Sequence, residues 1–398
     1  MKKWWKWLLL IIVILCSGFY LWNALTRPLF VHSAKINLIE NPVANSTFNW
    51  PEQGRAAVGF INKNTKETNC RTFGDTEKFP TASIAKIITS LVILEKYPLT
   101  ENYDGPIITM TESDIARLNA TIQQSGSFVA IHAGEQLTER QILQGILMAS
   151  ANNLADGLAV WAFGSLENYH AAAEIWLKEN NLSNIKIGSD ASGLDPETQA
   201  SSADLCKLIL IASQNSAFTQ IVSTKSVTFP LIGELKNTNS LIEQENIIGG
   251  KTGFTPEAGY GFVTLVNIDV NNSNQLAAVA VLGQSSYDEA FSQTQKLIDS
   301  LENNLTVHNL AKKGQIIGQV NSDWNKKIDL IAQDNIDVIS WIDEPAKYEI
   351  FSYTENRRSL QANKSIGKVY FSGKSVNIMT KTELSHPNFL WRILHGFQ

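Results

Sequence analysis

Cysteine is scarce in this sequence, and it contains no long block of basic residues. Cys16, Cys70 and Cys206 are the only cysteines among 398 residues, and three are too few to predict a disulfide framework. The 33 basic residues are outnumbered by 38 acidic ones, which gives a formal net charge of -5. We therefore expect no nucleic-acid partner. We also expect no metal ion and no cofactor.

One long hydrophobic run is present near the N-terminus. Residues 7–25 carry no charge, and they follow Lys2, Lys3 and Lys6. This arrangement is typical of an export segment, either a cleaved signal peptide or a transmembrane anchor. We favour an uncleaved anchor, because the run is about long enough to span a bilayer and no small-x-small cleavage site follows it. The lysines predict that residues 1–6 stay in the cytoplasm and that the chain beyond the anchor lies outside.

The rest of the chain is long enough for two domains, and the 44% hydrophobic content of the sequence allows each a core. Residues 26–51 are predicted to be a linker. Residues 52–304 combine helical and strand patterns, which predicts an α+β domain. Residues 305–384 contain short alternating runs separated by turns, which predicts a smaller all-β domain. Residues 385–398 form an amphipathic tail that either packs on this domain or contacts a membrane surface.

Apolar residues at helical spacing follow Pro80, which predicts a helix from just after Pro80 to about Tyr97. Ser83 lies in its first turn and Lys86 three residues later, so the hydroxyl and the amine can meet. A serine beside a lysine is a nucleophile beside a possible base. The unpaired amides of the first turn would stabilise an oxyanion there. The spacing alone is weak evidence, because it recurs at Ser183–Lys186 and Ser365–Lys368.

Two more polar groups stand at the ends of predicted elements. Ser150 and Asn152 lie between two predicted helices. Capping of a helix end would explain this pair equally well, and the pattern recurs at Ser213–Asn215 and Ser375–Asn377. The triplet Lys251-Thr252-Gly253 occurs once, in a glycine-rich apolar segment. We predict that this segment is the first strand of an antiparallel meander, with strands at 247–255, 260–268 and 275–282.

These three groups, in this order on a helix start, a helix end and a strand, resemble the motifs of penicillin-binding proteins and class A β-lactamases. From about residue 30 to about 300 the chain resembles the serine D-alanyl-D-alanine carboxypeptidases, the low-molecular-mass penicillin-binding proteins of peptidase family S11. The resemblance implies a β-lactamase/transpeptidase-like domain, an antiparallel sheet flanked by helices, followed by the family's smaller all-β domain.

The resemblance also implies an activity and a location. The enzyme would trim terminal D-alanine from peptidoglycan stem peptides through an acyl-enzyme on Ser83. β-Lactams, which look like that substrate, would be covalent inhibitors. The enzyme would act in the bacterial cell envelope, on the extracytoplasmic face of the cytoplasmic membrane.

The catalytic roles implied for the polar side chains follow from their chemistry. Lys86, crowded by the second cation at Lys251, would lose its proton easily and accept the proton of Ser83. Ser150 would relay a proton toward the leaving amine, and Asn152 would hold Lys86 and the substrate amide.

Substrate binding is expected along the strand that carries the third motif. Thr252 would bind the substrate carboxylate, and the strand edge through Gly253 would pair with the peptide as an added strand. The backbone amides of Ser83 and Phe254 would form the oxyanion hole.

The chain also departs from the family pattern. Ala151 replaces a common glycine, Phe254 stands where many relatives carry a polar residue, and residues 283–296 lack the arginine that well-known members place near the substrate's terminal carboxylate. A D,D-endopeptidase acting on cross-linked peptidoglycan is therefore an alternative. A β-lactamase is less favoured, because Glu197 is followed four residues later by Ser201 rather than asparagine. The presence of all the polar catalytic side chains argues against a non-catalytic cell-wall binding protein.

Overall fold

The computed structural model of the chain describes residues 4–32, 35–39, 43–74, 76–352 and 359–395. It divides into two compact units. The larger unit is Ser46–Leu305, and the smaller unit combines Met1–Asn45 with Thr306–Gln398. Two lysines of the expected cytoplasmic tail, Lys2 and Lys3, and the last three residues of the amphipathic tail lie outside the described residues.

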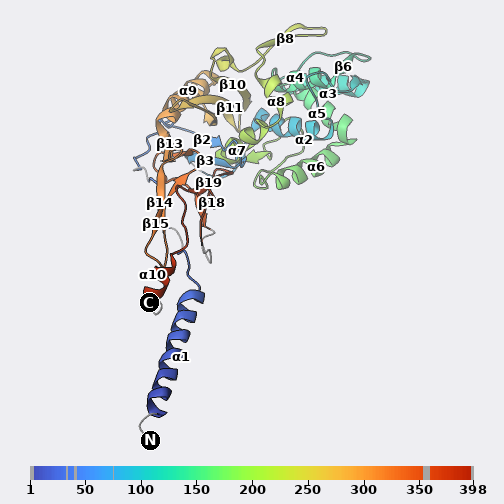
Figure 1. Cartoon of the computed structure of the whole chain (residues 1–398). Helices are drawn as coiled ribbons and strands as arrows, with labels where there is room; N and C mark the ends of the chain where they lie inside the picture. Colours follow the sequence, from blue (N-terminus) through green and yellow to red (C-terminus); the bar gives the residue numbers. More distant parts are fainter. Residues whose placement is uncertain (1–3, 33–34, 40–42, 75, 353–358, 396–398) are drawn as a thin grey trace. The chain divides into compact units, whose positions relative to one another are not determined.

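A five-stranded antiparallel sheet forms the centre of the larger unit (Figure 1). Its strand order is β10-β11-β12-β2-β3, so β10 lies at an edge. The predicted meander is confirmed, because β10 pairs with β11 and β11 pairs with β12. The strands are β2 (Arg55–Ile61), β3 (Thr68–Phe73), β10 (Ile247–Thr255), β11 (Gly259–Val270) and β12 (Ser273–Gln284).

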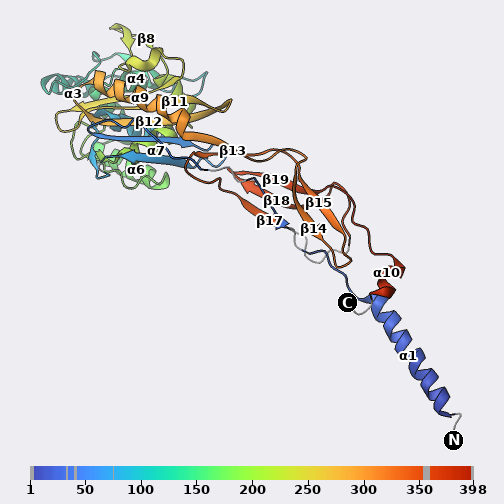
Figure 2. The ribbon, with the colours of Figure 1, turned by 90° about the vertical axis from the view of Figure 1, so that its left-hand side faces the viewer.

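Helices cover both faces of this sheet. Figures 1 and 2 show α9 (Tyr287–Asn304) on one face and α7 (Ser202–Ala212) on the other. Every residue of β12 from Ala277 to Leu282 is buried and apolar. Helices cover both faces of this strand, so neither face contacts water and both must be apolar. A further helical group shares this hydrophobic core: α2 (Lys86–Lys96), α4 (Glu139–Leu147), α5 (Asn152–Phe163) and α6 (Leu166–Glu179). The predicted α+β class is confirmed.

Several elements of the larger unit were not predicted. No helix was predicted over residues 107–132, but α3 (Glu112–Gln123) lies there. A capping box of Thr111 and Asp114 starts this helix. Only Leu118 and Thr121 in it are buried, so the helix has little of the apolar periodicity by which a helix is predicted from sequence. The others are α8 (Ser216–Val222), η2 (Ser240–Glu243), the hairpin β8 (Ser226–Phe229) and β9 (Gly233–Lys236), and the short pairs β4 (Phe79–Pro80) with β7 (Gln199–Ala200) and β5 (Ile107–Thr109) with β6 (Gln136–Thr138).

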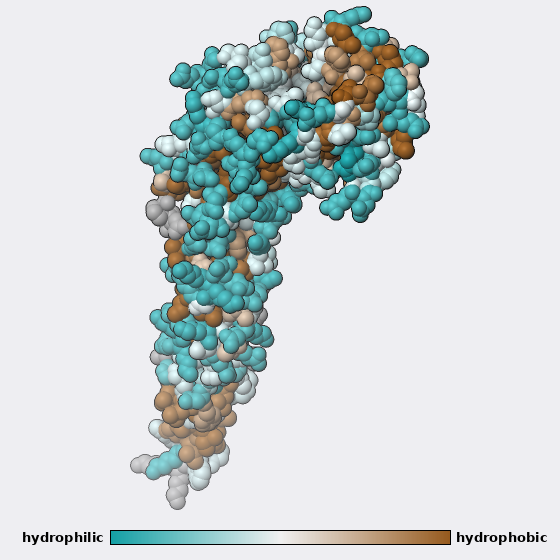
Figure 3. Space-filling model, turned by 90° about the horizontal axis from the view of Figure 1, so that it is seen from above, coloured by the Kyte–Doolittle hydropathy of each residue, from teal (hydrophilic) through white to brown (hydrophobic). Residues whose placement is uncertain are grey.

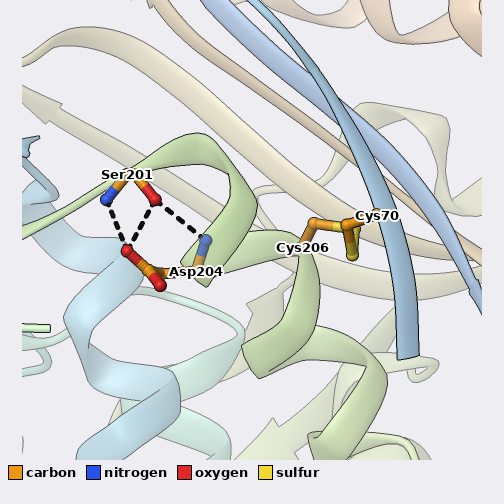
Figure 4. Close-up of a disulfide and its surroundings, with 4 residues drawn as sticks. All are labelled: Cys70, Ser201, Asp204 and Cys206. Atoms are coloured by element: carbon orange, nitrogen blue, oxygen red, sulfur yellow. Dashed lines mark hydrogen bonds between the residues drawn. A yellow bond between two sulfur atoms is a disulfide. The ribbon is translucent and has the colours of Figure 1, made fainter. Parts of the chain in front are cut away.

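A disulfide joins Cys70 on β3 to Cys206 on α7, 136 positions apart in the sequence (Figure 4). The cysteine count did not predict it, because only the packing of α7 on the sheet brings these residues together. Figure 4 also shows the start of α7, where the Ser201 hydroxyl donates to Asp204 at 2.6 Å. Gly59 makes room for the pair, since a Cβ there would lie 2.6 Å from each sulfur. Structural disulfides persist in oxidising compartments, which agrees with export.

The smaller unit contains a six-stranded sheet with the order β1-β14-β15-β19-β18-β17 (Figure 2). Its β1 comes from the segment predicted as a linker, which also contributes Leu29 and Val31 to the core of this unit. A separate pair, β13 with β16, completes the unit. The strands are β1 (Lys35–Ile36), β13 (Leu305–Ala311), β14 (Ile316–Asn321), β15 (Lys327–Ala332), β16 (Ile336–Trp341), β17 (Glu349–Ser352), β18 (Ser365–Phe371) and β19 (Lys374–Thr380).

Two helices of the smaller unit carry exposed apolar side chains. Among the described residues, α1 (Trp4–Thr26) is the one helix long and apolar enough to cross a membrane, and only Ala24 in it is buried. Figure 3 shows hydrophobic surface in brown, and the exposed apolar side chains of α1 contribute to such surface. The tail forms α10 (Phe389–Leu394), and Arg392 donates to the carbonyl oxygen of Leu25 at 2.8 Å, at the end of α1.

Candidate active site

Ser83 and Lys86 lie at the junction of two helical segments. Ser83 belongs to the 3-10 turn η1 (Ala82–Ala85), and Lys86 is the first residue of α2. The α-helix therefore begins later than predicted. Residues three apart in a 3-10 turn are eclipsed, so the two side chains still face each other. Lys86 Nζ lies 2.7 Å from Ser83 Oγ.

Lys86 is completely buried and fully hydrogen-bonded. Besides Ser83, its amine donates to Asn152 Oδ1 at 2.7 Å and to the Ser192 carbonyl oxygen at 2.8 Å. Burial lowers the pKa of the Lys86 amine to about 7, and the nearby carboxylates of Asp156 and Asp190 oppose this shift. The cause of the lowered pKa thus differs from our expectation, because desolvation rather than Lys251 dominates. Near pH 7 a large share of Lys86 is neutral and can accept a proton.

Ser150 lies between α4 and α5, as expected, whereas Asn152 is already part of α5. The Ser150 side chain is 6% exposed, and its backbone is in the left-handed region with a φ of 62°. Such a conformation in a serine is strained, and it is commonly found at functional sites. Asn152 begins α5, and its backbone N–H donates to the Ser127 carbonyl oxygen at 2.8 Å. The loop of Ser127 therefore borders the second motif.

The third motif lies on the edge strand β10. Lys251 is 1% exposed, and its amine donates to the Thr252 carbonyl oxygen at 3.0 Å. Burial, and then the charge of Lys86, lower the pKa of Lys251 well below its usual value. A Cβ on Gly253 would lie 3.0 Å from the Thr81 carbonyl oxygen, so glycine permits β10 to pack directly against η1. Phe254 is exposed at this edge.

A loop missed as part of the site completes the surroundings of Lys86. The carboxylate of Asp190 accepts backbone N–H bonds from Ser192, Gly193 and Asp195 at 2.6–2.7 Å. Asp156 accepts from Ala191 N–H at 2.8 Å. Burial and then the charge of Asp190 raise the pKa of Asp156 to about 6. These carboxylates were not predicted, because only tertiary packing places them near Lys86.

Two hydroxyl residues near Thr252 were also missed. Thr238 Oγ1 lies 2.8 Å from Thr252 Oγ1, and the Tyr287 phenol is hydrogen-bonded to Thr252. No motif marks either residue in the sequence. Within the described part of the chain, no group of three or more His, Cys, Asp or Glu side chains could hold a metal ion.

The arrangement supports acyl transfer. A partly neutral amine touches a serine hydroxyl, at a turn that offers unpaired backbone amides, and a second buried lysine lies close by. Solved structures share the fold. Penicillin binding protein 5 from Haemophilus influenzae aligns with a TM-score of 0.59 at 20% identity, covering 87% of this chain and 100% of that one. Fold and site together define a serine hydrolase of the penicillin-binding class.

The chain belongs to the D-alanyl-D-alanine carboxypeptidase family, peptidase family S11, whose model matches residues 72–286. It is 26% identical to the D-alanyl-D-alanine carboxypeptidase DacF of Bacillus subtilis over 274 residues, which is 66% of this chain and 67% of the relative. It is 30% identical to a D-alanyl-D-alanine endopeptidase of Pseudomonas aeruginosa over 205 residues, 48% of this chain and 60% of the relative. Penicillin-binding protein 3 of Streptococcus pneumoniae aligns with a TM-score of 0.61 at 18% identity, covering 83% and 99%.

Proposed function

We propose that the chain is a serine-type D-alanyl-D-alanine carboxypeptidase that removes the terminal D-alanine of peptidoglycan stem peptides through an acyl-enzyme on Ser83. The observation that carries this proposal is the 2.7 Å contact between the Ser83 hydroxyl and the buried Lys86 amine. Membership of the carboxypeptidase family supports the choice of substrate.

Acylation begins when Lys86 accepts the Ser83 proton and Ser83 Oγ attacks the carbonyl carbon of the penultimate D-alanine. The tetrahedral oxyanion forms beside the backbone amides of Ser83 and Phe254, which stabilise it by hydrogen bonds. The C–N bond then breaks, and the leaving amine takes a proton through Ser150. Asn152 keeps Lys86 in position by accepting a hydrogen bond from its amine.

Deacylation uses water. Lys86 accepts a proton from the water as its oxygen attacks the Ser83 ester, and Ser83 recovers its proton when the C–O bond breaks. A β-lactam opened by Ser83 has its leaving amine tethered to the acyl group, so it cannot depart. We therefore expect penicillins to remain attached as covalent adducts.

The test is mass spectrometry of the protein incubated with diacetyl-L-lysyl-D-alanyl-D-alanine. Release of D-alanine by the wild type, and its loss in both Ser83→Ala and Lys86→Ala, is the expected result. The chain offers matched controls in Ser183→Ala and Lys186→Ala, which repeat the spacing on the surface, where Lys186 pairs with Glu197. These controls should retain full activity. Release that persists in Ser83→Ala would overturn the proposal.

A D,D-endopeptidase is the alternative with specific support. The Pseudomonas aeruginosa relative carries that name, as does a 25% identical relative from Escherichia coli. Intact tripeptide alongside cleavage of cross-linked muropeptides would favour this activity. Two other functions are less favoured. A β-lactamase would turn over a fluorescent penicillin steadily rather than retain it as an adduct. If the protein were a non-catalytic binding protein, the Ser83→Ala variant would complement a deletion as well as the wild type does.

We further propose that α1 anchors the protein in the cytoplasmic membrane with the larger unit on the outer side. The length and apolar surface of α1 support this, as does Lys6 at its N-terminal end. The disulfide between Cys70 and Cys206 is what an oxidising compartment permits. The β-rich module predicted at 305–384 then serves as a spacer that holds the active site off the membrane.

A further inference from the structure

A buried pair of hydroxyl groups lies one helical turn beyond Lys86. Thr89 on α2 is completely buried, and its Oγ1 lies 2.6 Å from the Ala191 carbonyl oxygen and 2.7 Å from the phenolic oxygen of Tyr169 on α6. Tyr169 is 1% exposed. Because Thr89 follows Lys86 by three residues, both side chains lie on the same face of α2. The pair therefore contacts the loop whose next residue, Ser192, binds Lys86 through its carbonyl oxygen.

The direction of both hydrogen bonds follows from the protons that these groups have. The Ala191 carbonyl oxygen has no proton, so the hydroxyl of Thr89 donates to it. A threonine hydroxyl has one proton to give, which means that the phenol of Tyr169 donates to Thr89 Oγ1. Burial also raises the pKa of Tyr169, so the phenol keeps this proton at neutral pH. Two consecutive hydrogen bonds therefore run from α6 through α2 to the loop, and each strengthens the other.

Ala191 is held from two sides. Its carbonyl oxygen accepts from Thr89, and its N–H donates to Asp156 Oδ1 on α5 at 2.8 Å. The internal shape of the loop has a different origin, because the carboxylate of Asp190 accepts backbone N–H bonds from the residues that follow it. The bonds of Thr89 and Asp156 thus fix where the loop lies against the helices. They fix the position of the Ser192 carbonyl as well, since it belongs to the next residue.

The position of the Ser192 carbonyl determines where the lone pair of Lys86 points. Two of the oxygens that the Lys86 amine contacts, Asn152 Oδ1 and the Ser192 carbonyl oxygen, can only accept a hydrogen bond. A neutral amine has two protons and one lone pair. When both protons are donated to these acceptors, the lone pair is left for the hydroxyl proton of Ser83, 2.7 Å away. A displaced Ser192 carbonyl would free one of the two protons and allow the amine to rotate.

We propose that Thr89 and Tyr169 are positioning residues for the acylation of Ser83. Their hydroxyls fix the Ser192 carbonyl oxygen, and this oxygen orients the neutral amine of Lys86 for proton transfer. Both residues act through the loop, so neither is a catalytic residue. The inference rests on the proposed function, because the hydroxyls have this task only if Lys86 is the base.

The test measures how fast a fluorescent penicillin labels the protein at increasing penicillin concentrations, which yields a dissociation constant and a first-order acylation rate. Thr89→Val keeps the shape of the side chain and removes both hydrogen bonds. We expect the acylation rate to fall by at least about tenfold, because a small misplacement of a catalytic group has effects of this size. The dissociation constant and the final amount of adduct should keep their wild-type values. Thr89→Ser returns the hydroxyl and should restore the rate.

Two further variants complete the set. Tyr169→Phe removes only the first donor, so the acylation rate should fall by a smaller factor, about threefold. If Thr89→Val does not fold, Tyr169→Phe takes its place in the test. Ser90→Ala is the matched control, because Ser90 is also completely buried on α2 and its hydroxyl has no hydrogen-bond partner among the described residues. This control should leave the rate and the dissociation constant unchanged.

The pH profile separates a loss of orientation from a change in the pKa of Lys86. The charged groups that act on Lys86 are Asp156 on α5, Asp190 on the loop and Lys251 on β10, and Thr89→Val retains all of them. Burial holds the pKa of Lys86 at about 7, so its amine is neutral at about pH 9 in the wild type and in the variant. The slower acylation of Thr89→Val should therefore persist at this pH.

Three outcomes would overturn the inference while leaving the proposed function intact. One is a folded Thr89→Val protein, or in its absence Tyr169→Phe, that acylates at the wild-type rate. Another is a defect that disappears at high pH. The third is a Ser90→Ala protein that is slowed as much as Thr89→Val, since any loss of a buried hydroxyl from α2 would then have the same effect. If the wild type forms no adduct on Ser83, the proposed function fails and the inference fails with it.

Discussion

At the residue scale, two opposing effects set the pKa of Lys86. Burial lowers this pKa, and the carboxylates of Asp156 and Asp190 raise it. Asp156 and Asp190 reach Lys86 from a helix and from a loop, and neither carboxylate touches the reacting atoms. They are positioning residues that set how much of the amine is neutral. The loop that they hold also supplies the Ser192 carbonyl that binds Lys86.

The first prediction concerns the pH dependence of acylation. Lys86 must be neutral to accept the Ser83 proton, and burial holds its pKa at about 7. The second-order rate of acylation by a fluorescent penicillin should therefore rise about tenfold per pH unit below the midpoint and level off above pH 7. Asp156→Asn removes a charge that raises the pKa of Lys86, so the midpoint should move to lower pH. A midpoint that stays in place would show that Asp156 does not act on Lys86.

The sequence predicted the residues of this centre that share a local pattern. Ser83 and Lys86 are three apart, and a helical start brings such side chains together whatever the rest of the fold does. Asp156, Thr238 and Tyr287 meet the site only through tertiary packing, and no spacing in the sequence marks them. The cause of the lowered Lys86 pKa was missed for the same reason, because burial is a property of the folded chain.

At the scale of elements, the start of α4 was predicted correctly, but the burial of its first residue was not. Its capping box was predicted, and Thr138 accepts from Gln141 N–H at 3.3 Å. The first helical residue, Glu139, is fully buried, and neither of its carboxyl oxygens has a described hydrogen-bond partner. Burial raises the pKa of Glu139 to about 8, against a small opposite effect of Arg140. Most of this carboxyl group is therefore protonated in the folded protein at pH 7.

Glu139→Gln should therefore stabilise the protein at alkaline pH. The folded pKa lies above the unfolded value near 4.5, so the protonated side chain contributes stability that is complete below about pH 4.5 and is lost as the pH rises to 8. Glutamine has no such loss. The gain in free energy of unfolding should be near zero at pH 4.5 and about 4 to 5 kcal/mol at pH 8.5. Urea unfolding at both pH values measures it, and an equal effect at both would contradict the assignment.

The disulfide between β3 and α7 is a second feature of this scale that the sequence did not reveal. We expect the double variant Cys70→Ala/Cys206→Ala to melt roughly 5 to 10 °C lower, because the crosslink restricts the unfolded chain. Penicillin acylation at 25 °C should be unchanged, since neither cysteine contacts a proposed catalytic residue. Calorimetry and acylation kinetics measure the two effects. A loss of acylation at low temperature would instead connect the disulfide to the geometry of the site.

At the scale of the whole molecule, strong periodicity allowed prediction of the α+β unit, the β-rich unit and the apolar N-terminal helix. Sequence order concealed that residues from both ends of the chain build the smaller unit. Leu29 and Val31 are buried with residues from beyond position 306, although their surroundings in the sequence look like a linker. A two-residue strand such as β1 has too few positions to show an alternating pattern.

The last prediction is that α1 alone retains the protein in the membrane. Ile11 and Ile14 are exposed near the middle of α1, and each lysine placed there costs about 3 kcal/mol of insertion free energy. The double variant Ile11→Lys/Ile14→Lys should pass into the soluble fraction on alkaline carbonate extraction, whereas the wild type stays in the pellet. Trp4→Lys/Trp5→Lys is the matched control, since lysines at the helix end reach the interface and should not release the protein.

All three forms should still be labelled by penicillin, because every proposed catalytic residue belongs to the larger unit. A pellet that retains the mid-helix variant would mean that other surfaces, such as α10, bind the membrane.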